Sequence, residues 1–111
     1  MTEEIISGEA FDREIEDFDR KRHIVFEGLA RELQQAAASP ADTDFGKVVS
    51  HAQKVLGMSD IQMSVLFRVS RPTVNRWARG ATAPHPMLRK AVFDSLLSEV
   101  RQALKKLRAS A

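Results

Sequence analysis

The alternation of apolar and polar residues is most informative between residues 60 and 79. Met63 and Phe67 are four positions apart, and Val74 and Trp77 are three apart, so each pair falls on one face of a short helix. The few residues between the two patterns have the length of a tight turn. The pattern therefore predicts two short helices that cross, a helix-turn-helix.

Residues that favour helix ends occur at the matching positions. Ser59, with Gln62 three residues later, forms the capping-box pattern at the start of the first helix. Ser70 can cap the second helix, Pro72 is tolerated in its first turn, and Gly80 suits a left-handed C-terminal cap. These signals agree with the two predicted helices.

The second helix would present one strongly basic face. If Val74 and Trp77 are buried, the opposite face carries three arginines and no acidic residue. Because Trp77 shares the spacing of Val74, we expect it in the core rather than stacked on a nucleic-acid base. The exposed face would consist of Arg71, Pro72, Asn75, Arg76 and Arg79.

At this point the sequence resembles a known family. The stretch VSRPTVNRWARG is similar to the helix-turn-helix of lambda-repressor-like (XRE-type) bacterial and phage DNA-binding proteins, and the resemblance covers about residues 44–96. FGKVVSHAQKVLGMS resembles the family's first helix and PHPMLRKAVFDSL its closing helix. Two positions depart from the family pattern: Arg68 replaces a glycine in the turn, and Asp60 replaces a glutamine that often contacts a DNA phosphate.

The resemblance implies that the helix from Arg71 to Ala78 lies in the major groove of duplex DNA. Arg71 and Arg76 would pair with guanine, Asn75 with adenine, and Pro72 would contact a thymine methyl group. The simpler alternative is that Arg71 and Arg76 are only solvated surface charges. The predicted DNA-binding set is completed by three residues assigned to phosphates, Ser70, Thr73 and Arg79.

The N-terminal third predicts an acidic amphipathic helix over residues 9–39, preceded by a disordered segment at residues 1–8. Arg22 interrupts its apolar stripe, which argues against an extended parallel coiled coil. Three arrangements remain open: the helix folds back onto its own domain, it is a dimerisation arm, or it covers the basic face and inhibits it. The stripe consists of Phe11, Ile15, Phe18, Val25 and Leu29, flanked by Phe26 and Leu33.

The rest of the chain predicts two further helices, from Phe45 to Leu56 and from Pro86 onward. Ile61 and Val65 lie on the outer face of the first short helix, where adjacent apolar residues suggest a cover. We expect the N-terminal helix or a partner subunit to pack over them. The last helix continues as a C-terminal extension, residues 97–111, with a second candidate dimer contact through Leu97, Val100, Leu104 and Leu107.

Charge is divided unevenly along the chain. Residues 1–45 carry 5 basic and 12 acidic side chains, a net −7, and residues 46–111 carry 12 basic and 3 acidic ones, a net +9, which together give the overall +2. A basic domain of this kind is typical of a protein that binds a polyanion. The charge pattern therefore favours a nucleic-acid partner for the second half of the chain.

Composition argues against several other classes of protein. There is no cysteine, which excludes disulfides and thiolate metal sites. His23, His51 and His85 lie in separate segments without metal-ligand spacing, and no glycine-rich phosphate loop occurs, so we expect no catalytic residue, metal or cofactor. No apolar run approaches the roughly 20 residues of a membrane helix, and no signal-peptide pattern opens the chain. We expect a cytoplasmic, nucleoid-associated protein.

Together these features predict an all-α protein of five helices. A lambda-repressor-like helix-turn-helix domain over residues 44–96 would carry an added N-terminal helix and an extended C-terminal helix. The expected function is sequence-specific binding of double-stranded DNA by a dimeric transcriptional repressor, on a pseudo-palindrome with half-sites about 10 bp apart. The alternatives are an antitoxin or phage-control regulator, or a protein-interaction adaptor, whose terminal helices bind a partner protein.

Overall fold

The computed structural model describes residues 2–109, and the side chains of residues 13–109. That part of the chain contains five α-helices, one short 3-10 helix and no strand, which confirms the predicted all-α class. In chain order the elements are α1 (Thr2–Ala38), η1 (Pro40–Asp42), α2 (Phe45–Leu56), α3 (Asp60–Phe67), α4 (Arg71–Ala78) and α5 (Pro86–Ala109).

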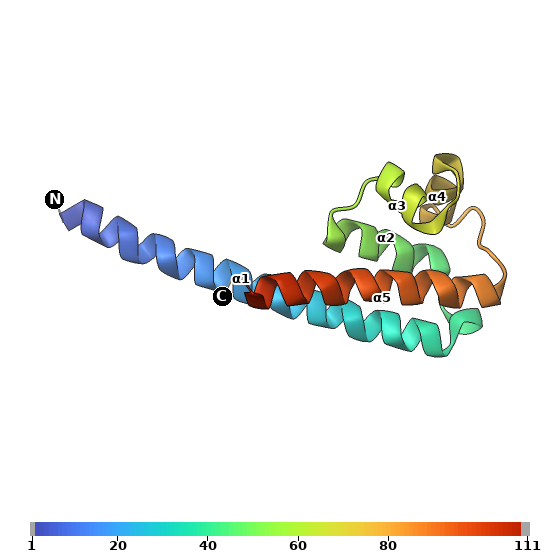
Figure 1. The fold of residues 1–111 in the computed structure, drawn as a ribbon, viewed down its shortest axis with the longest axis horizontal. Coiled ribbons are helices and arrows are strands. Elements are labelled where there is room, and N and C mark those ends of the chain that lie inside the picture. Colours follow the sequence, from blue (N-terminus) through green and yellow to red (C-terminus); the bar gives the residue numbers. More distant parts are fainter. Residues whose placement is uncertain (1, 110–111) are drawn as a thin grey trace.

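Helices α1 and α5 form a long antiparallel pair, and α2, α3 and α4 lie on one side of it (Figure 1). The pair makes the molecule elongated, with principal extents of 62 × 27 × 20 Å. Helix α1 is longer than α5, so its N-terminal half extends beyond the end of α5 (Figure 1). The buried residues of the pair are Phe26, Leu29, Leu33, Ala36 and Ala37 from α1 and Val92, Phe93, Leu96, Leu97, Val100 and Leu104 from α5.

The structure divides the predicted apolar stripe of α1 into two parts. Leu29 is buried with its two flanking residues, so the C-terminal half of α1 folds back onto the chain as one alternative predicted. Ile15, Phe18 and Val25 are exposed, and they belong to the part of the chain that precedes the buried segment of α1. The side chain of Phe11 lies outside the described residues.

The ends of the two terminal helices also differ from the prediction. Helix α1 begins at Thr2, so it runs through residues 2–8, for which the sequence indicated disorder. Helix α5 runs without a break from Pro86 to Ala109, across the predicted boundary between domain and extension.

The predicted dimer contact on α5 is wrong, and so is one of the two covers predicted for α3; a partner subunit as that cover stays a prediction. The seam of Leu97, Val100 and Leu104 is not available to a second subunit, because α1 covers it. Helix α1 does not cover Ile61 and Val65 either: these side chains are 53% and 72% exposed on α3. The reason is the same in both cases, since α1 packs along α5 and α2 and not on α3.

The predicted capping residues occupy the predicted places. The Ser59 hydroxyl accepts a hydrogen bond from the Gln62 backbone N–H at 3.1 Å, and the Gln62 side chain accepts one from the Ser59 N–H at 2.7 Å. Gly80, after the end of α4, has a φ of 75°. Arg68 has a φ of 56°, the left-handed geometry that glycine adopts more easily, at a cost of about 1 kcal/mol.

Trp77 joins α4 to the rest of the core. Its ring meets that of Phe45 edge to face, with centroids 5.4 Å apart and planes at 84°, and that of Phe67 at 6.2 Å. Phe45 in turn lies 5.5 Å from Phe93 of α5. Trp77 is buried with the fully buried Val74, in agreement with the core position predicted for it.

Gly46 allows α2 and α4 to approach each other closely. A Cβ atom at this position would lie 2.6 Å from the backbone oxygen of Trp77 and 3.1 Å from the Cα of Gly80. Both neighbours are backbone atoms, so they cannot move aside as a side chain would. The end of α4 therefore rests directly on the first turn of α2.

No helix in the described part of the chain is long and apolar enough to cross a lipid bilayer.

We expect the substitution Gly46→Ala to lower the free energy of unfolding by about 1–3 kcal/mol, because the added methyl group would push α4 away from α2. Urea denaturation followed by circular dichroism measures this. Gly28→Ala is the control: a Cβ there meets no atom within 4 Å, so alanine in helix α1 should raise stability by about 0.5–1 kcal/mol. Equal stability of Gly46→Ala and the wild type would contradict the close approach.

Candidate nucleic-acid interface

Helix α4 is held with one face in the core and the other in solvent. Val74 and Trp77 point inward, and the exposed residues cover an arc of about 140° on the opposite side. The arc contains no carboxylate, and its charges are three guanidinium groups. Its residues are Arg71, Pro72, Asn75, Arg76 and Arg79, all exposed as predicted.

Two of the predicted phosphate-binding residues have their hydroxyl groups in the helix cap. The Ser70 hydroxyl accepts a hydrogen bond from the backbone N–H of Thr73 at 3.2 Å and lies 2.8 Å from the Thr73 hydroxyl. Ser70 is exposed and Thr73 half-buried. The primary role of this pair is to begin α4. Any contact with a phosphate would use the hydrogen-bonding capacity that remains on the two hydroxyl groups.

Hydrogen bonds along the outer face of α4 orient its long side chains. The Arg79 Nε donates to the Asn75 Oδ1 at 2.8 Å, and the Arg76 guanidinium donates to the Thr73 hydroxyl at 3.2 Å. An amide oxygen accepts two hydrogen bonds, so Asn75 keeps acceptor capacity for a ligand. The bonds hold two arginines against the helix that carries them.

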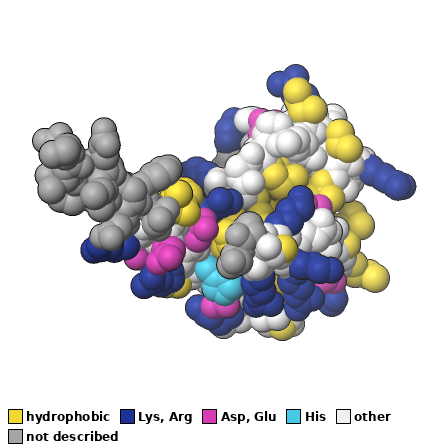
Figure 2. Space-filling model, turned by 60° about the vertical axis from the view of Figure 1, so that its left-hand side comes forward, with side chains coloured by type: hydrophobic (Ala, Val, Ile, Leu, Met, Phe, Trp, Pro, Cys, Tyr) yellow, Lys and Arg dark blue, Asp and Glu magenta, His cyan; other side chains and the backbone are white. Residues whose placement is uncertain are grey.

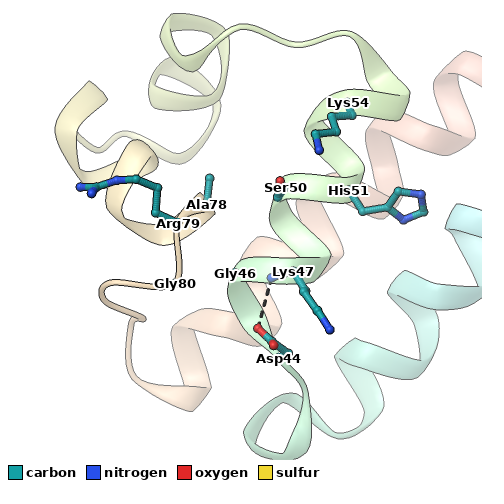
Figure 3. Close-up of a pocket in the computed structure, with 9 residues that line it drawn as sticks. All are labelled: Asp44, Gly46, Lys47, Ser50, His51, Lys54, Ala78, Arg79 and Gly80. Carbon is teal, nitrogen blue, oxygen red and sulfur yellow. Dashed lines mark hydrogen bonds between the residues drawn. The ribbon is translucent and has the colours of Figure 1, made fainter.

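A second row of polar residues lies on α2, next to α4. Lys47, Ser50 and Lys54 follow the spacing i, i+3 and i+7, which places them on one face of the helix. Lys54 extends toward α4, and Ser50 faces the same gap (Figure 3). The cleft between the helices is lined by Asp44, Gly46, Lys47, Ser50, His51, Lys54, Ala78, Arg79 and Gly80.

Arg79 makes this cleft continuous with the outer face of α4. Arg79 lines the cleft, and its side chain runs away from α2 (Figure 3). Its Nε is bonded to Asn75 on the outer face of α4. Lys47 and Lys54 were not among the residues predicted for this surface. Their helical spacing was a visible signal, but the place of α4 beside them was not.

A second hollow lies beside the exposed arc of α4. It is lined by Asp60, Arg71, Pro72 and Asn75, so its lining includes one carboxylate. The Asp60 Oδ1 accepts a hydrogen bond from the Gln53 Nε2 at 2.6 Å, which links α3 to α2. An ionised carboxylate cannot donate to a phosphate, as the sequence comparison with the lambda-repressor-like pattern indicated. Asp60 therefore acts here as a structural acceptor between helices.

The histidines take part in local pairs. A His23 ring nitrogen lies 2.8 Å from a Glu27 carboxylate oxygen, and a His51 ring nitrogen lies 2.8 Å from one of Glu32, which ties α2 to α1. The His85 ring accepts a hydrogen bond from the backbone N–H of Met87. Among the described residues, no group of three or more His, Asp or Glu side chains is placed to hold a metal ion.

The acidic half of α1 does not cover the basic surface. It extends away from α4 (Figure 1), and the packing partners of α1 are α5, α2 and η1. The inhibitory arrangement considered from the sequence is therefore not the one observed.

Comparison of the chain with protein-family models, with curated proteins and with solved structures found no match.

The substitution Ser70→Ala should lower the free energy of unfolding by about 1 kcal/mol, because it removes the cap of α4. Ser70→Asp should retain most of the stability, since aspartate caps as well as serine and opposes the helix dipole. Thermal denaturation of both variants checks this, with Ser98→Ala on an exposed face of α5 as the control that should lose nothing. Equal losses for Ser70→Ala and Ser70→Asp would mean that the hydroxyl does not act as a cap.

Proposed function

We propose that this protein binds double-stranded DNA sequence-specifically, with α4 in the major groove in the manner of lambda-repressor-like proteins. The observation that carries the proposal is the exposed arc of α4, which has three arginines, one asparagine and no acid on a helix anchored by Val74 and Trp77. A helix held in this way can enter a major groove without losing its core contacts. The resemblance of VSRPTVNRWARG to the family's helix-turn-helix supports the same assignment.

The side chains divide into two groups by chemistry. Arg71 and Arg76 are suited to pair bidentately with guanine, and Asn75 with adenine, each pair contributing about 1–3 kcal/mol of discrimination. Arg79, Lys47 and Lys54 border the cleft beside α4 and are suited to the phosphate backbone. The intrahelical bonds of Asn75 and Thr73 would be exchanged for contacts with DNA.

The distribution of charge supports a polyanion as the partner. Residues 46–111 carry a net +9, and the acidic half of α1 projects away from α4 (Figure 1). Acidic side chains would otherwise repel the DNA backbone and weaken binding at low salt. The arrangement leaves the basic surface open.

The regulatory role that fits best is a transcriptional repressor that acts in the cytoplasm on a pseudo-palindromic operator as a dimer, because a single helix reads only a few bases. The exposed apolar part of α1 also favours an antitoxin-like or phage-control regulator that holds a partner protein there. The two roles share the DNA contact and differ in what binds α1.

Selection from randomised duplex DNA tests base reading. The wild-type protein should enrich a two-fold-symmetric motif, and the double variant Arg71→Ala/Arg76→Ala should lose it while keeping its fold, because both side chains are exposed. The control Lys105→Ala/Lys106→Ala removes the same charge from an exposed part of α5 and should retain the motif. Enrichment of no motif by the wild type would refute sequence-specific binding and favour a protein-interaction adaptor.

The lysines of α2 should contribute to affinity and not to specificity. We expect Lys47→Ala/Lys54→Ala to weaken binding to the selected operator and to a scrambled duplex by the same factor. The plot of log K against log salt concentration has a negative slope, and its magnitude should decrease by about 2, since each phosphate contact contributes about 0.9. Fluorescence anisotropy at several salt concentrations measures both quantities. A change in the ratio of the two affinities would instead assign the lysines to base contacts.

A further inference from the structure

The apolar stripe of α1 continues past the point where α5 stops covering it. Leu29 and Leu33 are buried, whereas Ile15, Phe18 and Val25 lie on the same face, within an arc of about 80°, and are exposed. Figure 1 shows α1 extending beyond the end of α5. We call residues 13–25 the arm.

The arm has the composition of a helix that needs a partner. Its row of Ile15, Phe18 and Val25 interrupts an otherwise charged surface, and Phe18 is 61% exposed. Neighbouring exposed apolar side chains mark interaction sites, and an amphipathic helix is stabilised mainly by packing of its apolar face. The arm therefore lacks the second helix that α5 supplies further along.

We infer that the arm pairs antiparallel with the arm of a second copy of this chain. Arg22 decides the orientation, because it lies in the apolar row between Phe18 and Val25. A parallel pair would place Arg22 against Arg22, whereas an antiparallel pair centred at residue 20 places it against Phe18 of the second copy. The Arg22 guanidinium already lies 5.7 Å from the ring centroid of Phe18 and 5.5 Å from that of Phe26, so phenyl rings are its established neighbours.

Charge complementarity favours a second copy over an unrelated partner. Residues 14–19 carry four carboxylates, Glu14, Glu16, Asp17 and Asp19. The residues that follow have the opposite sign, since Arg20, Lys21 and Arg22 are three consecutive cations. In Figure 2, acidic side chains gather beside the segment drawn in grey and Lys and Arg side chains gather below and to the right of them.

An antiparallel pair brings these opposite charges together. With the centre at residue 20, position n of one copy faces position 40 − n of the other. Residues 14–19 of each arm then face residues 21–26 of the other copy, a segment that begins with Lys21 and Arg22. A parallel pair would instead align the acidic segments with each other, which is unfavourable.

Sedimentation equilibrium of the full chain tests the dimer without DNA. We expect the wild type to be a dimer and Phe18→Glu to weaken its dissociation constant at least 100-fold. Ile24→Glu is the matched control, because Ile24 is also 61% exposed on α1 but lies on another face, and it should remain dimeric. Circular dichroism should show equal helix content for both variants. A monomeric wild type, or equal effects of the two substitutions, would overturn the proposal.

The absence of cysteine from the chain allows the orientation to be tested by cross-linking. In the antiparallel pair, Ile15 faces Val25 of the second copy, whereas identical positions lie about 15 Å apart along the helix. An equal mixture of Ile15→Cys and Val25→Cys chains should therefore form a disulfide-linked dimer on mild oxidation, and each variant alone should not. A dimer formed by either variant alone would indicate a parallel pair and overturn the orientation.

A dimer formed elsewhere would also be detected. If Ile61→Glu/Val65→Glu abolished the dimer and Phe18→Glu did not, the interface would lie on α3 and the proposal would be wrong.

The consequence for the operator rests on the proposed function. Helix α4 packs on α2 and α3 and lies at the same end of the molecule's long axis as the C-terminal end of α1 (Figure 1). Residue 36 of α1 is 16 residues from the dimer centre, so the two recognition helices would lie roughly 50 Å apart along that axis by the rise of a helix. Adjacent half-sites are about 34 Å apart. The selected motif should therefore have half-sites more than 10 bp apart in the wild type, and single half-sites with Phe18→Glu. Retention of the wide motif by Phe18→Glu would overturn the arm dimer alone, and a wild-type dimer that selects no motif would overturn only the DNA function.

Discussion

The contact between the end of α4 and the first turn of α2 determines how the basic surface is built. The Trp77 ring fills the space between Phe45 and Phe67, and the missing side chain of Gly46 lets the Trp77 backbone lie against α2. The contact fixes the rotation of α4 about its axis, so that its arginines face solvent. It also brings Lys47 and Lys54 beside Arg79, which makes one surface from two helices.

The long α1–α5 pair supports that surface from behind and limits what else the chain can do. By covering Leu97, Val100 and Leu104, α1 removes the seam through which α5 could have met another subunit. By extending beyond α5, it carries its carboxylates away from α4 and leaves its own apolar row uncovered. The proposed dimer contact and the proposed DNA-binding surface thus lie toward opposite ends of the elongated molecule.

The outer face of α4 is ordered before any ligand arrives. Asn75 is bonded to Arg79, Thr73 to Arg76, and the Ser70 hydroxyl holds the first turn. Each bond is exposed and therefore individually weak, so exchanging it for one of the proposed contacts with DNA would cost little. Ordering of the long side chains beforehand reduces the entropy lost on binding.

The sequence by itself determined the local structure with considerable accuracy. The capping residues Ser59 and Ser70, the left-handed Gly80 and the burial of Val74 and Trp77 followed from spacing and from backbone chemistry, which act over a few residues. What only the tertiary structure decided depended on contacts between distant segments. Whether α1 folds back or projects, and whether the α5 seam is internal, could not be read from periodicity, because a stripe shows that a helix has a partner and not which one. Lys47 and Lys54 could not be assigned to the surface from the sequence for the same reason. Their place beside α4 depends on the contact of Gly46 with Trp77, more than 30 residues away along the chain.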